Sequence, residues 1–314
     1  MDTAKIIIRP EVVADYPAIA DIHMRAFDNR VDVSLIVSLQ RHRRSFDPEL
    51  SLVAELDGRV VGHVLFSPER IRLLSQSVPA VNLSPIGIDP AYQGQGIGGR
   101  LILEGHRIAA LKGYCLSILL GHPTYYPRFG YQQRAYGPSQ VIAAVNVLPK
   151  DLLETRKPTS EDVPALQELW RHEEGAVDMA LEPGPDLLDW LSPNTAVQAT
   201  VYTRNDEVVG YTRINAKEPT KPRVFLARDS EAARAMVAML AHALEADTPP
   251  TEYVLPLHPF SASTQAFGQA TPTAWNAAMV CPLGPSPFEE YMAAVQQGQR
   301  PPGRVIWPVA FDLD

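Results

Sequence analysis

Residues 86–99, IGIDPAYQGQGIGG, decide the fold expected for this chain of 314 residues. A short apolar run leads into a proline turn, and a loop dense in glycine then opens the helical run RLILEGHRIAALKG. Glycines let the backbone come very close to a bound group, and the first N–H groups of a helix lack partners within the helix. A strand, a glycine loop and a helix N-terminus in this order predict a site for a phosphate-bearing cofactor.

Two spacing patterns fit this loop. Gly94, Gly96 and Gly99 match the dinucleotide-binding fingerprint. Gln93, Gly96 and Gly98 match the Q/R-x-x-G-x-G/A loop that binds the diphosphate of coenzyme A. The dinucleotide pattern requires an acidic residue about 20 positions on, but the next predicted strand, CLSILL, is followed by GHP. The upstream sequence also predicts an antiparallel hairpin through an Asp-Gly turn, which favours coenzyme A.

At these residues the chain resembles the GCN5-related N-acetyltransferases (the GNAT family), over roughly its first 150 residues. The resemblance depends on QGQGIG, on the preceding IGIDP, and on PTYYPRFGY further along. In this family a tyrosine four residues before a Gly-Phe or Gly-Tyr pair often protonates the departing thiolate, and Tyr126 holds that position. The resemblance implies an N-acetyltransferase that passes the acetyl group of acetyl-CoA to an amine by direct attack.

The resemblance also implies which residues form the site. Tyr126 would be the catalytic general acid. The strand before the loop would pair its backbone with the pantetheine arm, and the loop with its helix start would hold the diphosphate. The cofactor-binding residues expected on this basis are Ile86, Gly87, Ile88, Gln93, Gly94, Gln95, Gly96, Ile97, Gly98, Gly99 and Arg100. No spacing of His, Cys, Asp or Glu predicts a metal site.

The general base stays open. The strand before the loop, SVPAVNLSPIGI, contains no carboxylate, which leaves His23, Glu55, His63 and His122 as candidates. His63 alternates with core positions in VGHVLF and is expected on the solvent face of the sheet. Because a lone histidine in a strand is more often structural, a water relay is the preferred interpretation.

Length and element order predict two tandem domains. Residues 1–150 follow the order β-α-α-β-β-β-α-β-α-β-β, with the last two strands expected at residues 131–137 and 139–148. Residues 151–314 begin the same plan again. The predicted fold class is α/β (α+β), with each domain a mixed, mostly antiparallel twisted sheet flanked by helices. Residues 1–150 would be the catalytic domain that binds acetyl-CoA, and residues 151–314 a degenerate copy.

The second copy departs from the first at the loop. It has RDSEAA where QGQGIG would stand, so no glycine allows close approach of a ligand. Asp229 or Ser230 is expected to cap the following helix, and Glu231 would repel a diphosphate. The closing residues 304–311, RVIWPVAF, predict a final strand.

Composition is that of an ordinary globular protein, with 46% hydrophobic and 20% charged residues. The apolar runs are shorter than a membrane span and no signal peptide is visible. We therefore expect a cytoplasmic protein without membrane contact. Cys115 and Cys281 are the two cysteines, and they predict free thiols rather than a structural disulfide.

Charge is distributed unevenly along the chain. Residues 1–150 hold 16 Lys and Arg against 13 Asp and Glu, whereas residues 151–314 hold 12 against 23. A basic half suits a polyanionic cofactor, and an acidic half would repel nucleic acid and is compatible with a cationic amine. The expected partner is a small-molecule or peptide amine, not nucleic acid or membrane, with a homodimer as one option.

Two other functions stay open. The absent carboxylate base is compatible with a non-catalytic acyl-CoA-binding sensor or regulatory protein. A dinucleotide-dependent oxidoreductase is disfavoured, because the acidic residue after the next strand is missing. The acceptor amine itself is not predicted, since helices within residues 11–43 and the second domain would build its pocket.

Overall fold

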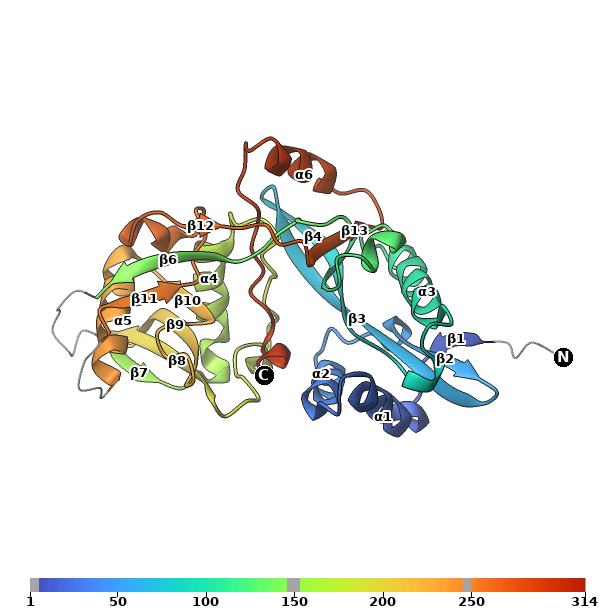
Figure 1. The fold of residues 1–314 in the computed structure, drawn as a ribbon. Helices are drawn as coiled ribbons and strands as arrows, with labels where there is room; N and C mark the ends of the chain where they lie inside the picture. The colour runs from blue at the N-terminus through green and yellow to red at the C-terminus, as the bar shows by residue number, and fades with distance from the viewer. Residues whose placement is uncertain (1–5, 146–152, 245–249, 314) are drawn as a thin grey trace.

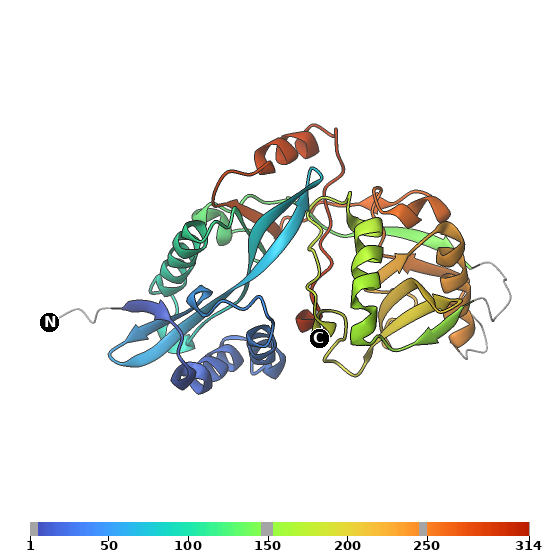
Figure 2. The ribbon, with the colours of Figure 1, turned by 180° about the vertical axis from the view of Figure 1, so that it is seen from behind.

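The structure is a computed structural model that describes residues 6–145, 153–244 and 250–313. Its two halves lie side by side, and the C-terminal segment runs between them (Figures 1 and 2). Each half is built on a mostly antiparallel sheet with helices packed against it. This arrangement confirms the fold class predicted from the order of elements.

The sheet of the first half has six strands in the order β1-β2-β3-β4-β5-β13. They are β1 (Ile7–Pro10), β2 (Ser51–Leu56), β3 (Arg59–Leu73), β4 (Gln76–Ile88), β5 (Leu116–Leu120) and β13 (Ala278–Pro282). Only β4 and β5 are parallel neighbours in this sheet. Asp57 and Gly58 both have positive φ between β2 and β3, as the predicted two-residue hairpin turn requires.

Helices cover both faces of this sheet (Figure 1). α1 (Tyr16–Ala26) and α2 (Val31–Arg41) pack on one face, and α3 (Ile97–Leu111) packs on the other. A Cβ atom on Gly105 of α3 would lie 2.0 Å from the ring of Phe66. Because Gly105 has no Cβ, α3 lies close against β3 with its N-terminus near the end of β4.

The second half contains a four-stranded sheet and a three-stranded sheet. Its elements include β7 (Glu154–Arg156), α4 (Val163–Glu174), β8 (Val197–Arg204), β9 (Glu207–Asn215), β10 (Val224–Ala227) and α5 (Ser230–Ala243). In contrast, α6 (Phe288–Gln296) packs against the sheet of the first half (Figure 1). Over the described residues, no helix combines the length and the apolar character needed to span a bilayer. Cys115 and Cys281 are free thiols.

The two halves exchange strands. β6 (Ser139–Ala144) precedes the expected domain boundary, yet it pairs with β11 (Glu252–Leu255) and β12 (Thr271–Pro272) of the second half. β13 comes from the second half and pairs with β5 instead. Assigning the strand expected at residues 139–148 to the first sheet is therefore wrong for its described part, because β13 occupies the edge of β5. The boundary at residue 150 stays a prediction and lies outside the described residues.

Two other expected strands are wrong. Residues 131–137 make only isolated bridges, because Arg134 has a φ of 62° that interrupts an extended run. Residues 304–311 end in the short 3-10 helix η8 (Val309–Phe311) instead of a strand. Pro308 has no N–H group to donate to a sheet ladder, and the segment instead runs between the two halves.

Candidate active site

A cavity of about 1440 Å³ opens between the two halves. It follows β4 from Asn82 to Ile88, reaches the N-terminus of α3, and is closed on another side by residues 305–313. Pockets for drug-sized ligands are typically about 300–1,000 Å³. This cavity therefore has room for one large ligand or for two ligands together.

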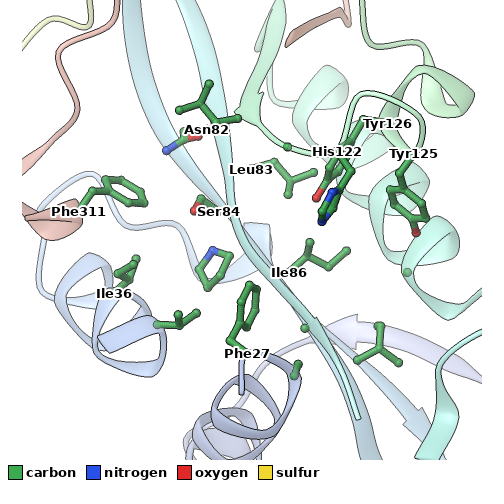
Figure 3. Close-up of a pocket in the computed structure, with 18 of the residues that line it drawn as sticks. Phe27, Ile36, Asn82, Leu83, Ser84, Ile86, His122, Tyr125, Tyr126 and Phe311 are labelled. Atoms are coloured by element: carbon green, nitrogen blue, oxygen red, sulfur yellow. The ribbon is translucent and has the colours of Figure 1, made fainter. Parts of the chain in front are cut away.

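β4 divides the cavity into two sides (Figure 3). Tyr125 and Tyr126 lie on the side of α3, near the start of that helix. Phe27, Ile36 and Phe311 lie on the side of α2. The two sides differ in chemistry, because the glycine loop lines the first, whereas apolar side chains together with paired charged residues line the second.

β4 separates from β5 along the cavity. The two strands pair only from Ala80 to Asn82 of β4, whereas β4 continues beside β3 as far as Ile88. Beyond Asn82 the other edge of β4 has no strand partner within the described ranges. This free edge can accept an extended ligand, as an exposed sheet edge does with a peptide.

The glycine loop contains two kinds of glycine. Gly94 and Gly96 have φ values of 77° and 78°, and no atom lies within 4 Å of the place a Cβ would take on either residue. Gly98 and Gly99 instead allow aromatic rings to approach α3. A Cβ on Gly98 would lie 2.8 Å from the hydroxyl of Tyr125. The loop therefore leaves open space at its first two glycines and close packing at its last two.

The N-terminus of α3 is open. Its N-cap residue is Gly96, no described side chain caps it, and its first turn contains no acidic residue. The unpaired N–H groups and the positive end of the helix dipole are thus available to an anion. Nearby, Gln93 donates from Nε2 to the carbonyl of Ile88 at 3.1 Å, and Arg100 donates to the carbonyl of Ile6 at 2.8 Å.

The matching helix of the second half is closed at its N-terminus. The carboxylate of Asp229 accepts a hydrogen bond from the N–H of Ala232 at 2.7 Å. Glu231 in the first turn pairs with Arg204 at 3.3 Å. The prediction that Asp229 caps α5 is confirmed, and its carboxylate occupies the position that a bound anion would need.

Ten of the eleven expected cofactor-binding residues line the cavity, and Gln95 does not. Its side chain is exposed to solvent in the loop. Arg128 lines the same side, with its guanidinium carbon 4.5 Å from the centre of the Tyr125 ring. Sequence reasoning missed Arg128, although a basic residue within YYPRF, beside an expected diphosphate site, was a usable signal.

Tyr126 begins η4 (Tyr126–Phe129) and lies in the cavity wall with 9% of its surface exposed. Burial raises its pKa to about 12, so the phenol keeps its proton at neutral pH. A Cβ on Gly121 would lie 2.2 Å from the Tyr126 ring, so the glycine makes room for it. The hydroxyl has no hydrogen-bond partner in the part of the chain that the structure describes, which makes it an available proton donor.

Comparison with known proteins identifies the family. A family model described as an acetyltransferase (GNAT) domain matches residues 8–134. YjhQ of Escherichia coli K12, described as an uncharacterized N-acetyltransferase, is 38% identical over 119 residues, which are 38% of this chain and 65% of that protein. YhbS of the same strain, described in the same way, is 33% identical over 132 residues, which are 42% of this chain and 76% of that protein. The chain belongs to the GNAT family.

Two solved GNAT structures share the fold over both halves of the chain. The enzyme from Anabaena variabilis has a TM-score of 0.67 at 15% identity, covering 89% of this chain and 73% of that one. The enzyme from Kribbella flavida has a TM-score of 0.68 at 17% identity, covering 90% of this chain and 72% of that one. At such low identity the likeness concerns the fold alone. It shows that both halves of the chain share a fold with these two structures.

Only one of the four candidate bases lines the cavity between the two halves. His122 lines it, and Figure 3 shows His122 beside Tyr126. Glu55 accepts a hydrogen bond from Arg9 at 2.8 Å and is not part of the cavity lining. A carboxylate held by an arginine and remote from the cavity cannot take a proton from a ligand there.

The other two histidines, His23 of α1 and His63 of β3, form a buried chain of polar contacts between that helix and the sheet. Nε2 of His23 lies 2.7 Å from Nδ1 of His63, whose Nε2 lies 2.9 Å from the hydroxyl of Ser51 and 3.4 Å from the carboxylate of Glu11. Desolvation lowers the pKa of both histidines. The expectation that His63 faces solvent is wrong, because α1 covers that face of the sheet. Neither histidine lines the cavity.

Both carboxylates among the described lining residues are paired with arginine. Asp32 pairs with Arg30, and Asp312 pairs with Arg213 at 2.9 Å and with Arg223 at 2.8 Å. Neither carboxylate is thus left without a cationic partner. Among the described lining residues, no unpaired carboxylate is therefore available to a cationic amine.

Sequence reasoning missed the residues on the α2 side of the cavity. They are Phe27, Val33, Ile36, Asn82, Ser84, Trp307 and Phe311. A polar Asn82 within the apolar run AVNLSP was a usable signal for a functional position. No local pattern indicates that Trp307, 225 positions further along, lines the same cavity, because only the path of the C-terminal segment brings it there.

Proposed function

We propose that this GNAT chain is an N-acetyltransferase that transfers an acetyl group from acetyl-CoA to an amine by direct attack. The observation that carries the proposal is the cradle at Gly94 and Gly96, where open space replaces a side chain beside the uncapped start of α3. The diphosphate of coenzyme A suits this cradle, since anions bind the free N–H groups of a helix start. The N-terminus of α5 in the second half is already capped by Asp229, which supports a single cofactor site.

Residues of β4 would hold the rest of the cofactor. The free edge at Ile86, Gly87 and Ile88 offers N–H and C=O groups to the amides of a pantetheine arm. One N–H group of this edge can polarise the thioester carbonyl. The remaining proposed contacts come from Gln93, Ile97, Gly98, Gly99 and Arg100.

Acetyl-CoA, when bound, supplies the acetyl group, whose carbonyl carbon gains a bond to the amine nitrogen as its bond to sulfur breaks. Tyr126 donates its phenolic proton to the departing sulfur, and burial keeps that proton in place until then. The attacking amine enters in its neutral form and loses its remaining excess proton to water in the cavity. Tyr126 then regains a proton from solvent, leaving an amide and a free thiol.

A non-catalytic acyl-CoA sensor is the second candidate function. Asp32 and Asp312, the two lining carboxylates, are both held by arginines. The described cavity lining therefore offers no unpaired carboxylate as a base. A sensor would need the cradle but not Tyr126, so turnover separates the two functions.

Tyr126→Phe tests the proposal. The Kd of acetyl-CoA, measured by calorimetry, should change less than twofold, because the ring still packs against Gly121. Thiol release with a panel of amines should show kcat lowered by about 10²-fold or more, the usual contribution of proton transfer. Tyr114→Phe is the matched control, since Tyr114 packs on the α3 core and is not in the cavity lining.

Three outcomes are informative. Parent protein that releases thiol and loses this activity in Tyr126→Phe, but not in Tyr114→Phe, supports the enzyme. Acetyl-CoA binding without thiol release for any amine supports the sensor. Absence of acetyl-CoA binding contradicts both functions.

A further inference from the structure

Asn82 is a buried amide without a partner. Its exposed fraction is 0%, and neither Oδ1 nor Nδ2 has a hydrogen-bond partner among the described residues. Buried polar groups in native proteins are nearly always paired, so an unpaired one needs an explanation. Asn82 lines the cavity and is the last residue of β4 paired with β5. Its amide therefore stands where the free edge of β4 begins, which is where a ligand group can satisfy it.

The space around Asn82 is apolar. We call it the acceptor chamber, defined by Phe27, Val33, Ile36, Asn82, Trp307 and Phe311. Figure 3 shows Asn82 and Ser84 on β4 next to a space bordered by Phe27, Ile36 and Phe311. Aromatic and aliphatic walls with a few polar groups are typical of sites for small apolar ligands.

The described carboxylates beside the acceptor chamber are already paired, which disfavours a polycation. Asp32 is paired with Arg30, and Asp312 is paired with Arg213 and Arg223. A ligand with several ammonium groups would find no unpaired carboxylate among the described lining residues. The apolar side chains of the wall disfavour the charged form of an amine. They favour the neutral amine that acetyl transfer requires.

On the basis of the proposed acetyl transfer, we infer that the acceptor is a molecule with one amino group attached to an apolar body about the size of an aromatic ring. We further infer that Asn82 positions the nitrogen of that amino group. Oδ1 of Asn82 accepts a hydrogen bond from an N–H of the neutral amine, which fixes the nitrogen at the start of the free edge of β4. Phe27, Trp307 and Phe311 hold the apolar body. The second half of the chain thus contributes one wall of the acceptor chamber and selects the acceptor.

A binding experiment tests the inference without turnover. 2-Phenylethylamine is titrated into the protein, with and without coenzyme A, and nitrogen–proton NMR signals are followed. The indole signal of Trp307 and the side-chain amide of Asn82, assigned with Trp307→Phe and Asn82→Ala, should shift in at least one condition. Spermidine should shift neither. Shifts caused by spermidine instead, or none with 2-phenylethylamine in either condition, overturn the inference.

A kinetic experiment tests the role of Asn82. Asn82→Ala should lower kcat/KM for 2-phenylethylamine at least tenfold, with KM for acetyl-CoA within twofold of the parent value. Ser67→Ala is the matched control, because Ser67 opposite Asn82 on β3 also has a buried unpaired hydroxyl but does not line the cavity. It should keep kcat/KM within twofold. Equal losses in both variants would mean that a shared buried water satisfies the amide, which overturns the inference.

If Asn82→Ala does not fold, Asn82→Asp is the variant to use, because it keeps the size of the side chain. Its negative charge should raise kcat/KM for spermidine relative to 2-phenylethylamine at least fivefold, and an unchanged ratio overturns the inference. A parent protein that acetylates spermidine better than 2-phenylethylamine contradicts the inference but not the proposed function. A parent that acetylates no amine contradicts the proposed function, and the NMR titration then decides the inference alone.

Discussion

Glycines with the same backbone conformation have different roles in this protein. Gly96 has a left-handed φ, serves as N-cap of α3 and borders open space. Gly58 has nearly the same φ and equally open surroundings, but it lies in the β2–β3 hairpin turn. Comparing these two glycines separates backbone strain from ligand contact.

Gly96→Ala should weaken cofactor binding. A methyl group there would occupy the cradle proposed for the diphosphate, so the Kd of coenzyme A should rise at least tenfold. The left-handed φ should also cost about 1–2 kcal/mol of folding free energy. Calorimetry gives the Kd, and urea unfolding gives the stability.

Gly58→Ala is the control, because it should lose about the same stability and keep the parent Kd. A Kd that changes equally little in both variants would contradict the assignment of the diphosphate to this loop.

At the scale of elements, α4 is bound to the segment that closes the cavity. Glu173 accepts hydrogen bonds from the N–H and the hydroxyl of Ser263, both at 3.0 Å, in η7 (Ala262–Ala266). The adjacent Glu174 pairs with Arg304, at the start of the segment that carries Trp307. These two buried carboxylates connect α4 to both η7 and the C-terminal segment.

The stability of this connection should depend on pH. Burial, with the neighbouring Glu174 as a second cause, raises the pKa of Glu173 to about 8. A raised pKa means that the folded state holds a proton that the unfolded state loses above about pH 4.5. The resulting stabilisation is therefore complete below pH 4.5 and is lost as pH rises through 8, at up to about 1.4 kcal/mol per pH unit.

Glu173→Gln should flatten the fall in Tm between pH 6 and pH 9, measured by calorimetry. Glu168→Gln, on the exposed face of α4, should leave the parent profile unchanged. A parent Tm that does not fall over this range would show that Glu173 is ionised in the folded protein.

At the scale of the whole molecule, strand exchange joins the two halves. β6 completes the small sheet of the second half, and β13 completes the large sheet of the first. Met279 of β13 is fully buried in the core under α3, which consists mainly of first-half residues. Neither half can unfold without removing a strand from the other, so we expect one cooperative transition.

Met279→Ala should lower the stability of both halves together, by about 2–5 kcal/mol, as for other buried large-to-small changes. Trp170 and Trp190 lie in the core under α4, so their fluorescence, with Trp275 and Trp307 replaced by Phe, reports the second half, while amide exchange of β3 and β4 reports the first. Both probes should shift to the same lower urea midpoint.

Ile142→Ala, at an exposed position of β6, is the control and should change the midpoint little. Separate midpoints for the two probes would contradict a single cooperative unit.

The sequence alone determined the elements whose signals are local. The Asp57–Gly58 turn specified the β2–β3 hairpin, and the apolar periodicity after Gly96 specified α3. The cap of α5 was narrowed to Asp229 or Ser230 from their positions alone, and the structure shows that it is Asp229. Such features depend on backbone conformation and on neighbours within a few residues, so a single sequence is enough to predict them.

Only the tertiary structure decided which residues share the cavity and which strands share a sheet. It buried His63 under α1, left Asn82 unpaired beside the free edge of β4, and brought Trp307 to the same cavity. It also exchanged β6 and β13 between the halves. The physical reason is that burial, pairing and pocket composition depend on contacts between residues far apart in sequence, and those contacts exist only once the whole chain has folded.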